Sequence, residues 1–462
     1  MQLGGSEGSA RIRDCRHPAP PIISPCNHGR NMPSELPRRL GLLDSSAIVV
    51  GTIIGSGIFL VPNLVARSLP SAPWIIAVWI FTGALSFFGA LAYAELGAMI
   101  PATGGQYVFL REAYGPLWGF LCGWTYFFVV ISAAIGWLAI TFATYLGYFI
   151  PLTPALSKLV AITLIAAITF VNYRGITLGA TVQKLFTFTK VAALAILVAA
   201  AFVGPAHAVS ENAAGPVTLS GFGVAMISCL LSYDGWVALS FVAGEVRDPK
   251  RTLPLALALG VGGAIAIYVL ANIAYLRVLS VGEIAATARV GALAAERTMG
   301  PTGGAFVSFS ILMSIVGAIN GWVLAAPRIY FAQARDGLFF RSFAAIHPRF
   351  QTPYVSILTF GAWSALLAIT GTYETLASYA MYAAWVFYAL TALAVIALRR
   401  RQPDRPRPYR MTGYPVTLLI FAAVAFGFVI NTFYATPGPA IVGTLLIGAG
   451  VPVYFIWRGT AG

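Results

Sequence analysis

The fold of this chain is decided by the stretch Val49-Val50-Gly51-Thr52-Ile53-Ile54-Gly55-Ser56-Gly57-Ile58-Phe59. The stretch lies inside the first long apolar run, residues 42–69, which is long enough to cross a bilayer. The glycines at 55 and 57 weaken a helix and let the backbone unwind, which exposes amide groups. An unpaired amide at mid-membrane is costly unless a cavity or a ligand satisfies it. The stretch therefore indicates either a polar site whose amides face an anion, or close packing of helices through small residues.

The composition places the whole chain among polytopic membrane proteins. Of its 462 residues, 58% are hydrophobic and only 10% are charged. Apolar runs recur along the chain, and no soluble domain of ordinary size fits between them. We expect twelve spans, at about residues 42–69, 73–99, 117–149, 155–173, 185–204, 222–246, 254–279, 303–332, 353–371, 375–398, 414–434 and 439–457.

The chain is predicted to have four parts. Residues 1–35 are rich in Gly, Pro, Ser and Arg, lack apolar periodicity, and are expected to form a disordered N-terminal tail. Residues 36–212 are expected to form a first transmembrane repeat with spans 1–5, and residues 213–400 a second repeat with spans 6–10. Residues 401–462 would hold spans 11 and 12 and the C-terminus.

Positive charge is distributed unevenly along the chain. If the N-terminus is cytoplasmic, 23 of the 29 Lys and Arg residues fall in cytoplasmic segments. Because loops on the cytoplasmic side of membrane proteins carry an excess of Lys and Arg, we expect a multi-pass protein of the cell (inner) membrane with both termini cytoplasmic. The same distribution accounts for the net charge of +14 without a nucleic-acid partner.

The sequence indicates neither an enzyme nor a metal protein. The four histidines fall in the tail or in loops, and the four cysteines lack the spacing of a metal site or a disulfide framework. No lysine follows the glycine pattern of a phosphate-binding loop. We therefore expect no catalytic residue, no metal and no cofactor.

A second break lies in the sixth run, at Cys229-Leu230-Leu231-Ser232-Tyr233-Asp234-Gly235-Trp236-Val237. It comes five spans after the first break. Broken helices at matching positions in two five-span halves are typical of secondary transporters built from inverted repeats. One break offers amide donors and the other offers carbonyl acceptors, which suits the carboxylate and the ammonium of an amino acid.

Lys190 lies a few residues into the expected fifth span. An ammonium inside a span is costly, and such groups usually face a cavity or a partner. One interpretation is a fixed or titrating cation that replaces a coupling sodium ion. The other is a side chain that extends to the cytoplasmic interface, one to two turns away.

Four further polar or aromatic residues are candidates for the same cavity. Asp234, the only acidic residue near the centre of a span, either contacts the substrate ammonium or caps the second half-helix. Tyr233, Trp236 and Asn320 either line the cavity or are packed interior residues with satisfied hydrogen bonds.

Other polar residues lie near the ends of spans. Glu95 and Glu245 fall near cytoplasmic ends, where a gate or an ion pair suits them better than substrate binding. Gly104-Gly105-Gln106-Tyr107 and residues 403–409 are expected to be turns and anchors in cytoplasmic loops.

Five motifs together resemble the amino acid–polyamine–organocation (APC) superfamily, and within it the bacterial type of the L-type amino acid transporter (LAT) branch. They are Gly-Thr-Ile-Ile-Gly-Ser-Gly-Ile-Phe (51–59), Ala-Tyr-Ala-Glu-Leu-Gly with Ile-Pro-Ala-Thr-Gly-Gly-Gln-Tyr (92–107), Ser-Tyr-Asp-Gly-Trp (232–236), Gly-Glu-Val-Arg-Asp-Pro-Lys-Arg-Thr-Leu-Pro (244–254) and Ala-Arg-Asp-Gly-Leu (334–338). The resemblance implies an all-α, LeuT-like fold: two inverted five-span repeats, broken helices 1 and 6, two extra helices, and alternating access.

The resemblance also implies roles for single residues. The amides of Ser56 and Gly57 would bind the substrate carboxylate, and carbonyls around Ile53, Leu231 and Asp234 would accept from its ammonium. Lys190 matches the fifth-span lysine of sodium-independent members and is the expected coupling residue. Leu231 stands where many relatives have an aromatic gate, and Leu231 and Trp236 are the expected gate residues. The expected substrate-binding residues are Ile53, Gly55, Ser56, Gly57, Leu231, Tyr233, Asp234, Gly235 and Asn320.

We therefore expect a sodium-independent transporter of neutral L-amino acids that works by exchange or by proton coupling. Its expected partners are the amino acid substrate and the lipid bilayer. Eukaryotic relatives join a heavy subunit through a cysteine after span three, and residues 150–157 contain none, so no disulfide-linked subunit is expected. The alternatives are a carrier of cationic amino acids or polyamines, for which only Asp234 offers a carboxylate, and a non-transporting amino acid sensor.

Overall fold

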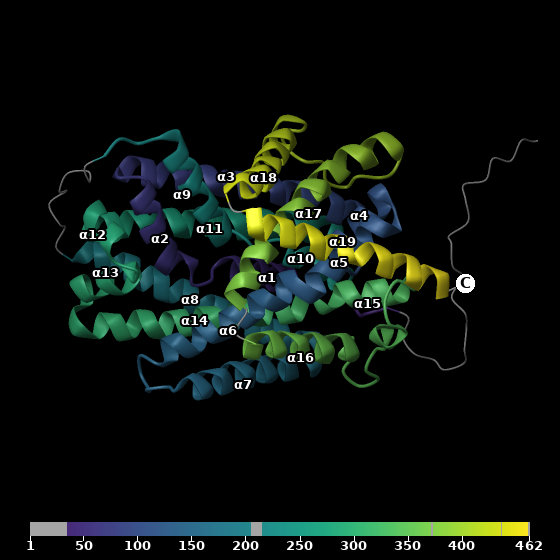
Figure 1. Cartoon of the computed structure of the whole chain (residues 1–462), viewed down its shortest axis with the longest axis horizontal. Helices are drawn as coiled ribbons and strands as arrows, with labels where there is room; N and C mark the ends of the chain where they lie inside the picture. Colours follow the sequence, from purple (N-terminus) through teal and green to yellow (C-terminus); the bar gives the residue numbers. More distant parts are fainter. Residues whose placement is uncertain (1–34, 205–214, 371–372, 436, 461–462) are drawn as a thin grey trace, which may run out of the picture. The chain divides into compact units, whose positions relative to one another are not determined.

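The computed structural model describes residues 35–204, 215–370, 373–435 and 437–460. The expected disordered tail, residues 1–35, lies outside the described residues except for its last residue. Within the described ranges the chain is helical apart from its loops, and its one β-type contact is an isolated parallel bridge between Leu40 and Val246. The prediction of an all-α protein is confirmed for these residues (Figure 1).

The helices follow one another along the chain as labelled in Figure 1. The first half contains α1 (Leu42–Ile53), α2 (Gly57–Ser68), α3 (Ala72–Met99), α4 (Gln106–Tyr114), α5 (Pro116–Thr125), the π-helical turn η1 (Tyr126–Val130), α6 (Ile131–Leu146), α7 (Pro154–Tyr173) and α8 (Ile176–Val203). The second half contains α9 (Leu219–Ser232), α10 (Ala238–Phe241), η2 (Ala243–Glu245), α11 (Pro249–Val278), α12 (Val281–Ala286), α13 (Val290–Met299), η3 (Gly300–Thr302), α14 (Gly303–Ala325), α15 (Pro327–Arg335), η4 (Arg341–Ala344), α16 (Tyr354–Thr370), α17 (Tyr373–Arg401), α18 (Val416–Ala435) and α19 (Pro437–Thr460).

The length and apolar character of these helices define a multi-pass membrane protein. In the described chain, nine helical segments are long and apolar enough to cross a membrane, and the bent pair α1–α2 makes a tenth. The two remaining apolar helices, α9 and α16, have 14 and 17 residues. Because a span needs about 20 residues, the expected count of twelve spans is not established by helix length alone.

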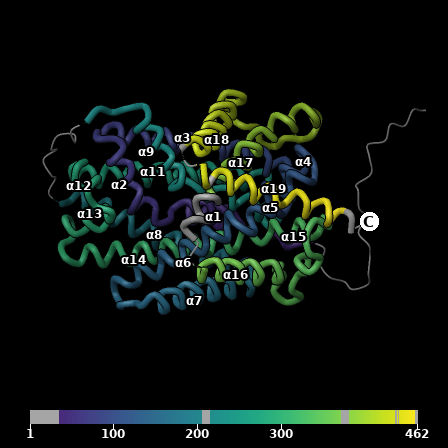
Figure 2. The backbone as a smooth tube through the Cα atoms, viewed as in Figure 1, coloured from purple at the N-terminus to yellow at the C-terminus, as the bar shows by residue number. Residues whose placement is uncertain are grey.

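The expected break in the first span is confirmed. α1 ends at Ile53 and α2 begins at Gly57, and the two helices are bent by 43° relative to each other. Ile54, between them, has the extended conformation φ −75°, ψ 91°, which interrupts the helical hydrogen-bond ladder. The path of the chain through this break can be followed in Figure 2.

The expected break in the sixth span is also confirmed. α9 ends at Ser232, and helical structure resumes only at Ala238. Gly235 has a φ of +118°, which glycine adopts without steric cost. A Cβ atom at this position would lie 2.7 Å from the carbonyl carbon of Thr52, so the two breaks approach each other as closely as backbone allows.

The broken helices are enclosed by other spans. α1 contacts α8, α11 and α14, and α2 contacts α9 and the short helices α12 and α13. α7 and α16 lie side by side and pack against α6, while α18 and α19 pack on α17 (Figure 1). Ile48 and Val49 of α1 have no exposed surface, as expected for the centre of a helical bundle.

The segment before α1 is tied to the end of the sixth span by its backbone. The amides of Arg39 and Leu40 donate to the carbonyl oxygen of Glu245 at 2.8 and 2.9 Å, and the amide of Arg247 donates to the carbonyl oxygen of Leu40 at 2.8 Å. We call these contacts, with the Leu40–Val246 bridge, the backbone tie. It links the segment that precedes α1 to the segment that follows the second half of the sixth span.

Two predicted elements are wrong. α8 begins at Ile176, ahead of the expected start at residue 185, because polar residues such as Gln183 face neighbouring helices rather than a loop; Gln183 is fully buried. Gln106 and Tyr107 were expected in a turn but begin α4. The turn itself is made by Gly104 and Gly105, whose φ angles of 105° and 46° favour glycine.

Helix α12 begins with a capping box outside the membrane-spanning segments. The amide of Glu283 donates to Ser280 Oγ at 3.2 Å, and the amide of Ser280 donates to Glu283 Oε2 at 2.8 Å. Arg297 donates to the same carboxylate. The Ser280 amide, and then Arg297, lower the pKa of Glu283 from 4.5 to about 2.

Glu283→Gln is expected to lower the melting temperature of the protein at neutral pH. Because the folded pKa lies below the unfolded one, the stabilisation is complete above pH 4.5 and is lost as the pH falls toward about 2. Thermal unfolding in detergent at several pH values measures this, with Glu296→Gln, an exposed carboxylate of α13, as the matched control. A deficit of the same size at pH 2 and pH 7 would contradict the assignment.

Candidate functional site

The two helix breaks meet through a side chain as well as through backbone. Thr52 Oγ1 lies 2.9 Å from the carbonyl oxygen of Gly235 and 2.7 Å from that of Ile48. On the other half of the first span, a Cβ atom on Gly57 would lie 2.7 Å from Ser232 Oγ. Spans 1 and 6 are therefore in contact on both sides of their breaks.

Tyr268 of α11 bridges the breaks. Its hydroxyl lies 2.9 Å from the carbonyl oxygen of Ile53 and 3.0 Å from that of Ser232, which are the last residues of α1 and α9. A hydroxyl has one proton, so it donates to one of these carbonyls at a time. Sequence reasoning missed Tyr268, since a single tyrosine in an apolar run carries no distinctive signal.

Tyr268→Phe is expected to reduce transport about ten-fold while the protein remains folded. The substitution keeps the ring and leaves two helix-terminal carbonyls without this donor, and one hydrogen bond is worth about 0.5–1.5 kcal/mol. Initial uptake rates in liposomes measure the effect. Tyr275→Phe, another buried tyrosine of α11, is the control; equal activity of both variants would argue against a role for the bridge.

Open space adjoins the first break. A Cβ atom on Gly55 would meet no atom within 4 Å, whereas Ser56 is 3% exposed. At the start of α2 the amide of Phe59 donates to the carbonyl oxygen of Ser56 at 3.1 Å, whereas those of Gly57 and Ile58 come too early in the helix to have an acceptor within it, and the helix dipole places partial positive charge there. The space beside Gly55 therefore faces donors suited to an anion such as a carboxylate.

Lys190 lies near the middle of α8, and 1% of its surface is exposed. Its Nζ donates to the carbonyl oxygens of Gly51 at 2.8 Å, Ile54 at 2.5 Å and Ser314 at 3.1 Å. Ser314 Oγ also donates to the carbonyl oxygen of Ile54, at 2.9 Å. The interpretation of a side chain extending to the interface is therefore wrong: the ammonium joins the end of α1 to α14.

Asp234 accepts a hydrogen bond from the hydroxyl of Tyr388 on α17, at 2.7 Å. The carboxylate is half-buried, and among the described residues it pairs with no Lys or Arg within 4 Å. The predicted capping role is wrong, because the N-cap position of α10 is Val237. Asp234 instead places a carboxyl group at the second break and links that break to α17 through Tyr388.

Tyr233 and Trp236 point away from the first break. The Tyr233 hydroxyl donates to the carbonyl oxygen of Trp79 at 3.2 Å. The Trp236 ring meets the Tyr93 ring edge-on, with centroids 4.9 Å apart, and also packs on Tyr388. Both residues fit the second of their two interpretations, that of packed interior aromatics.

The side chain of Asn320 is also engaged with neighbouring spans. Asn320 Nδ2 donates to the carbonyl oxygen of Gly179 at 3.0 Å and to Gln183 Oε1 at 2.8 Å, and its Oδ1 accepts from Asn172 at 2.9 Å. Its hydrogen-bonding groups are thus used between spans. Leu231, at the end of α9, is 43% exposed.

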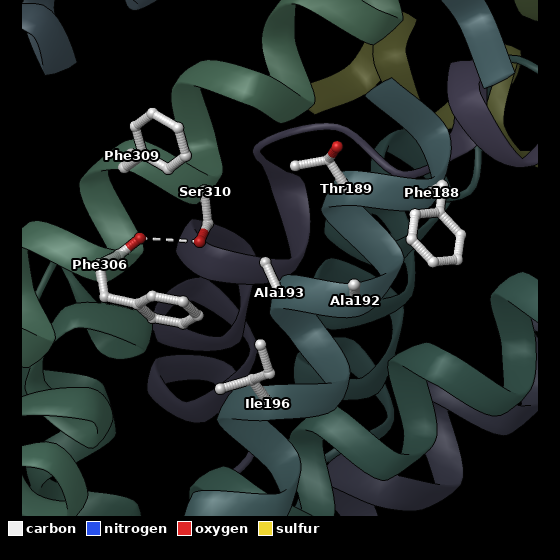
Figure 3. A pocket seen from close by; sticks show the side chains of 8 residues that line it. All are labelled: Phe188, Thr189, Ala192, Ala193, Ile196, Phe306, Phe309 and Ser310. Atoms are coloured by element: carbon white, nitrogen blue, oxygen red, sulfur yellow. Dashed lines mark hydrogen bonds between the residues drawn. The ribbon is translucent and has the colours of Figure 1, made fainter. Parts of the chain in front are cut away.

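A groove of about 300 Å³ opens between α8 and α14, as Figure 3 shows. Phe188 and Phe309 at its rim are 75% and 52% exposed. Its hydroxyls are already bonded within their own helices: Thr189 donates to the carbonyl oxygen of Leu185, and Ser310 to that of Phe306. An apolar groove on the outer face of two spans does not suit an amino acid, so the breaks remain the candidate site.

Ion pairs join the spans at the end where α1 begins. Arg328 Nε lies 2.7 Å from Glu245 Oε1, and the two side chains are 1% and 0% exposed. Arg399 donates to both oxygens of Glu95, at 2.8 and 2.6 Å. The ion-pair interpretation of Glu95 and Glu245 is therefore confirmed.

Two opposed helix breaks inside a bundle of membrane-spanning helices, with donors at one and carbonyls at the other, define a secondary transporter. A comparison of the whole chain with known families agrees. The chain belongs to the amino acid permease family, which its residues 40–457 match. The expected membership of the APC superfamily is thus confirmed, and with it the LeuT-like fold.

The chain is also similar to individual transporters over most of its length. It is 34% identical to the serine/threonine exchanger SteT of Bacillus subtilis, covering 91% of this chain and 97% of that protein. It is 31% identical to the human b(0,+)-type amino acid transporter 1, covering 82% and 79%. It is 32% identical to the large neutral amino acids transporter small subunit 2 of mouse, covering 91% and 81%.

Proposed function

We propose that this chain exchanges neutral L-amino acids across the cell membrane, without sodium, by alternating access. The observation that carries the proposal is the buried ammonium of Lys190 against three backbone carbonyls at the first break. Carbonyl oxygens in such an arrangement are ligands for a cation such as sodium. A covalently held cation removes the need for sodium, and the similarity to the serine/threonine exchanger SteT favours exchange over proton coupling.

The substrate binds between the two breaks in this proposal. Its carboxylate lies at the amides of Ser56 and Gly57, where the helix dipole of α2 stabilises negative charge. Its ammonium is held by carbonyls at the ends of α1 and α9, around Ile53 and Leu231. These carbonyls can accept a second hydrogen bond because each oxygen has two lone pairs.

The same proposal covers topology and partners. Both termini are cytoplasmic, so the ion pairs of Glu95 and Glu245 close the cytoplasmic side. Residues 36–212 and 213–400 act as the two inverted repeats, with spans 11 and 12 outside them. The segment between α6 and α7 has no cysteine, which favours a transporter that works without a disulfide-linked heavy subunit.

The testing experiment uses purified protein in sodium-free liposomes. Vesicles are either empty or preloaded with mixed neutral amino acids, and uptake of a labelled neutral panel is followed with and without an inward acid gradient. Uptake confined to loaded vesicles is expected. Gradient-driven uptake into empty vesicles would replace exchange by proton coupling, and no uptake in any condition would overturn the neutral amino acid proposal.

Gly57→Val is expected to reduce uptake far more than Ser56→Ala. The amides are the proposed carboxylate ligands, and Ser56→Ala leaves them in place. A side chain at Gly57 would collide with Ser232, whose Oγ lies 2.7 Å from the added Cβ. Uptake rates of both variants at matched protein levels provide the measurement, and equal, mild effects would argue against carboxylate binding here.

A second candidate function is transport of cationic amino acids. It is favoured by one observation, the half-buried Asp234 carboxylate, which lies at the second break with Tyr388 as its hydrogen-bond donor. A substrate side chain with positive charge would neutralise it. Labelled lysine and arginine in the same liposomes decide between the two, and Asp234→Asn should selectively reduce their uptake if this candidate is right.

A further inference from the structure

A buried hydroxyl at the contact of the two breaks has no partner. Ser232 is 4% exposed, and its Oγ forms no hydrogen bond with any of the described residues. A buried hydroxyl without a partner has lost its hydrogen bonds to water and gained none in return, which destabilises the structure around it. An unpartnered buried hydroxyl in a native structure needs an explanation, and one explanation is a ligand that accepts its hydrogen bond when bound.

Two other helical serines, Ser228 and Ser364, use the hydrogen-bond acceptor that Ser232 does not. Serine in a helix commonly donates to the carbonyl four residues earlier. Ser228, one turn before Ser232 in α9, donates to the carbonyl oxygen of Val224 at 3.2 Å, and Ser364 of α16 donates to that of Phe360 at 2.9 Å. Ser232 lies at the last position of the same helix, so its free hydroxyl is a matter of orientation and not of residue type.

The direction of this hydroxyl is toward the start of α2. Ser232 Oγ lies 2.7 Å from the place where a Cβ on Gly57 would stand, so it touches the residue that opens that helix. The amides there carry the positive end of the helix dipole. The backbone of Ser232 is itself held in place, because its carbonyl accepts from Tyr268 at 3.0 Å.

We propose that Ser232 is a substrate-binding residue whose hydroxyl donates to the α-carboxylate of the transported amino acid, beside the amides of α2. The inference rests on the proposed function and adds a side-chain ligand from span 6 to a site otherwise made of backbone. The bound carboxylate then joins the two broken helices, because it accepts hydrogen bonds from the α2 amides of span 1 and from the Ser232 hydroxyl of span 6. Ser232 thereby selects substrates with a free carboxylate.

The test is the affinity of the purified full chain for an amino acid and for its carboxamide. Titration calorimetry with L-serine and L-serinamide, and with L-leucine and L-leucinamide, gives the ratio of their dissociation constants. Ser232→Ala should weaken binding of the acids about ten-fold or more, as expected for a hydrogen bond to a charged group. It should leave the amides nearly unchanged, so the acid-to-amide ratio falls. Ser228→Ala, with the same substitution one turn earlier, should match the wild type.

Further outcomes keep the inference separate from folding and from the function itself. If Ser232→Ala does not fold, Ser232→Cys, which keeps a weak donor, should give an intermediate acid-to-amide ratio. A wild-type ratio in either variant would overturn the role of Ser232 while leaving neutral amino acid transport intact. A wild type that binds no L-amino acid would instead overturn the proposed function, and this inference with it.

Discussion

Lys190→Met is expected to reduce the rate of amino acid exchange about 10–100-fold relative to the wild type. The methionine side chain is of similar length but has no donor, so the carbonyl oxygens of Gly51, Ile54 and Ser314 lose their shared partner. Hydrogen bonds from a charged donor are worth about 1.5–3 kcal/mol each. The loss falls directly on the unwound segment that carries the proposed carboxylate site.

The matched control is Lys184→Met, six residues earlier on α8. Lys184 pairs with Asp44 at 2.8 Å and is 37% exposed, so its removal should change stability by at most about 1 kcal/mol. Exchange in sodium-free liposomes and a melting curve are measured for both variants. Normal exchange by Lys190→Met would overturn the fixed-cation role. Exchange that returns only when sodium is added would strengthen it.

Arg328→Met is expected to have the second largest effect, on stability as well as transport. It leaves the Glu245 carboxylate buried at 0% exposure without its cation. Breaking one side of a buried ion pair costs about 3–5 kcal/mol. We therefore expect the melting temperature to fall by several degrees. Uptake should fall with it, because the carbonyl oxygen of Glu245 accepts the two hydrogen bonds of the backbone tie that joins spans 1 and 6.

The double variant Glu245→Leu with Arg328→Met decides whether Arg328→Met lowers stability through the unpaired charge of Glu245 or through lost packing. Replacing a whole buried pair by apolar side chains is often neutral, so the double variant should recover most of the melting temperature. Arg405→Met is the control, because its pair with Glu112 is about 30% exposed. A double variant as unstable as the single one would show that packing, and not an unpaired charge, is lost.

The backbone part of the site was predictable from sequence, and its side-chain part largely was not. Gly55, Gly57 and Gly235 indicate the two breaks because they lie at matching positions of two five-span halves, a pattern that helix packing through small residues alone does not require. Lys190 was recognised by its charge, but its depth was misjudged, since the buried polar residues at the start of α8 looked like a loop. In this chain, glycines and a charge within a span therefore predicted parts of the site, whereas the ends of helices were not predicted correctly.

The sequence could not predict the role of residues for which that role depends on the direction in which their helix face points. Tyr268 was missed, and the sequence could not decide whether Tyr233, Trp236 and Asn320 line the cavity or pack between spans, as they do in the structure. Nothing in an all-apolar span distinguishes the face that meets a cavity from the face that meets a neighbour. For the same reason Ser232 was quoted in the second break without a role.

The backbone tie between residues 39–40 and 245–247 has a consequence for how this protein tolerates sequence change. Its hydrogen bonds use only amides and carbonyls, so most side-chain substitutions leave them intact. Alanine substitutions would leave these hydrogen bonds in place, and the exposed Arg39 could diverge while its amide keeps donating; Leu40 is buried, so packing constrains its side chain separately. Only proline, which has no amide hydrogen, removes the donor. The two broken spans are thus coupled by a feature that sequence drift can hardly erase and that variant screens will rarely detect.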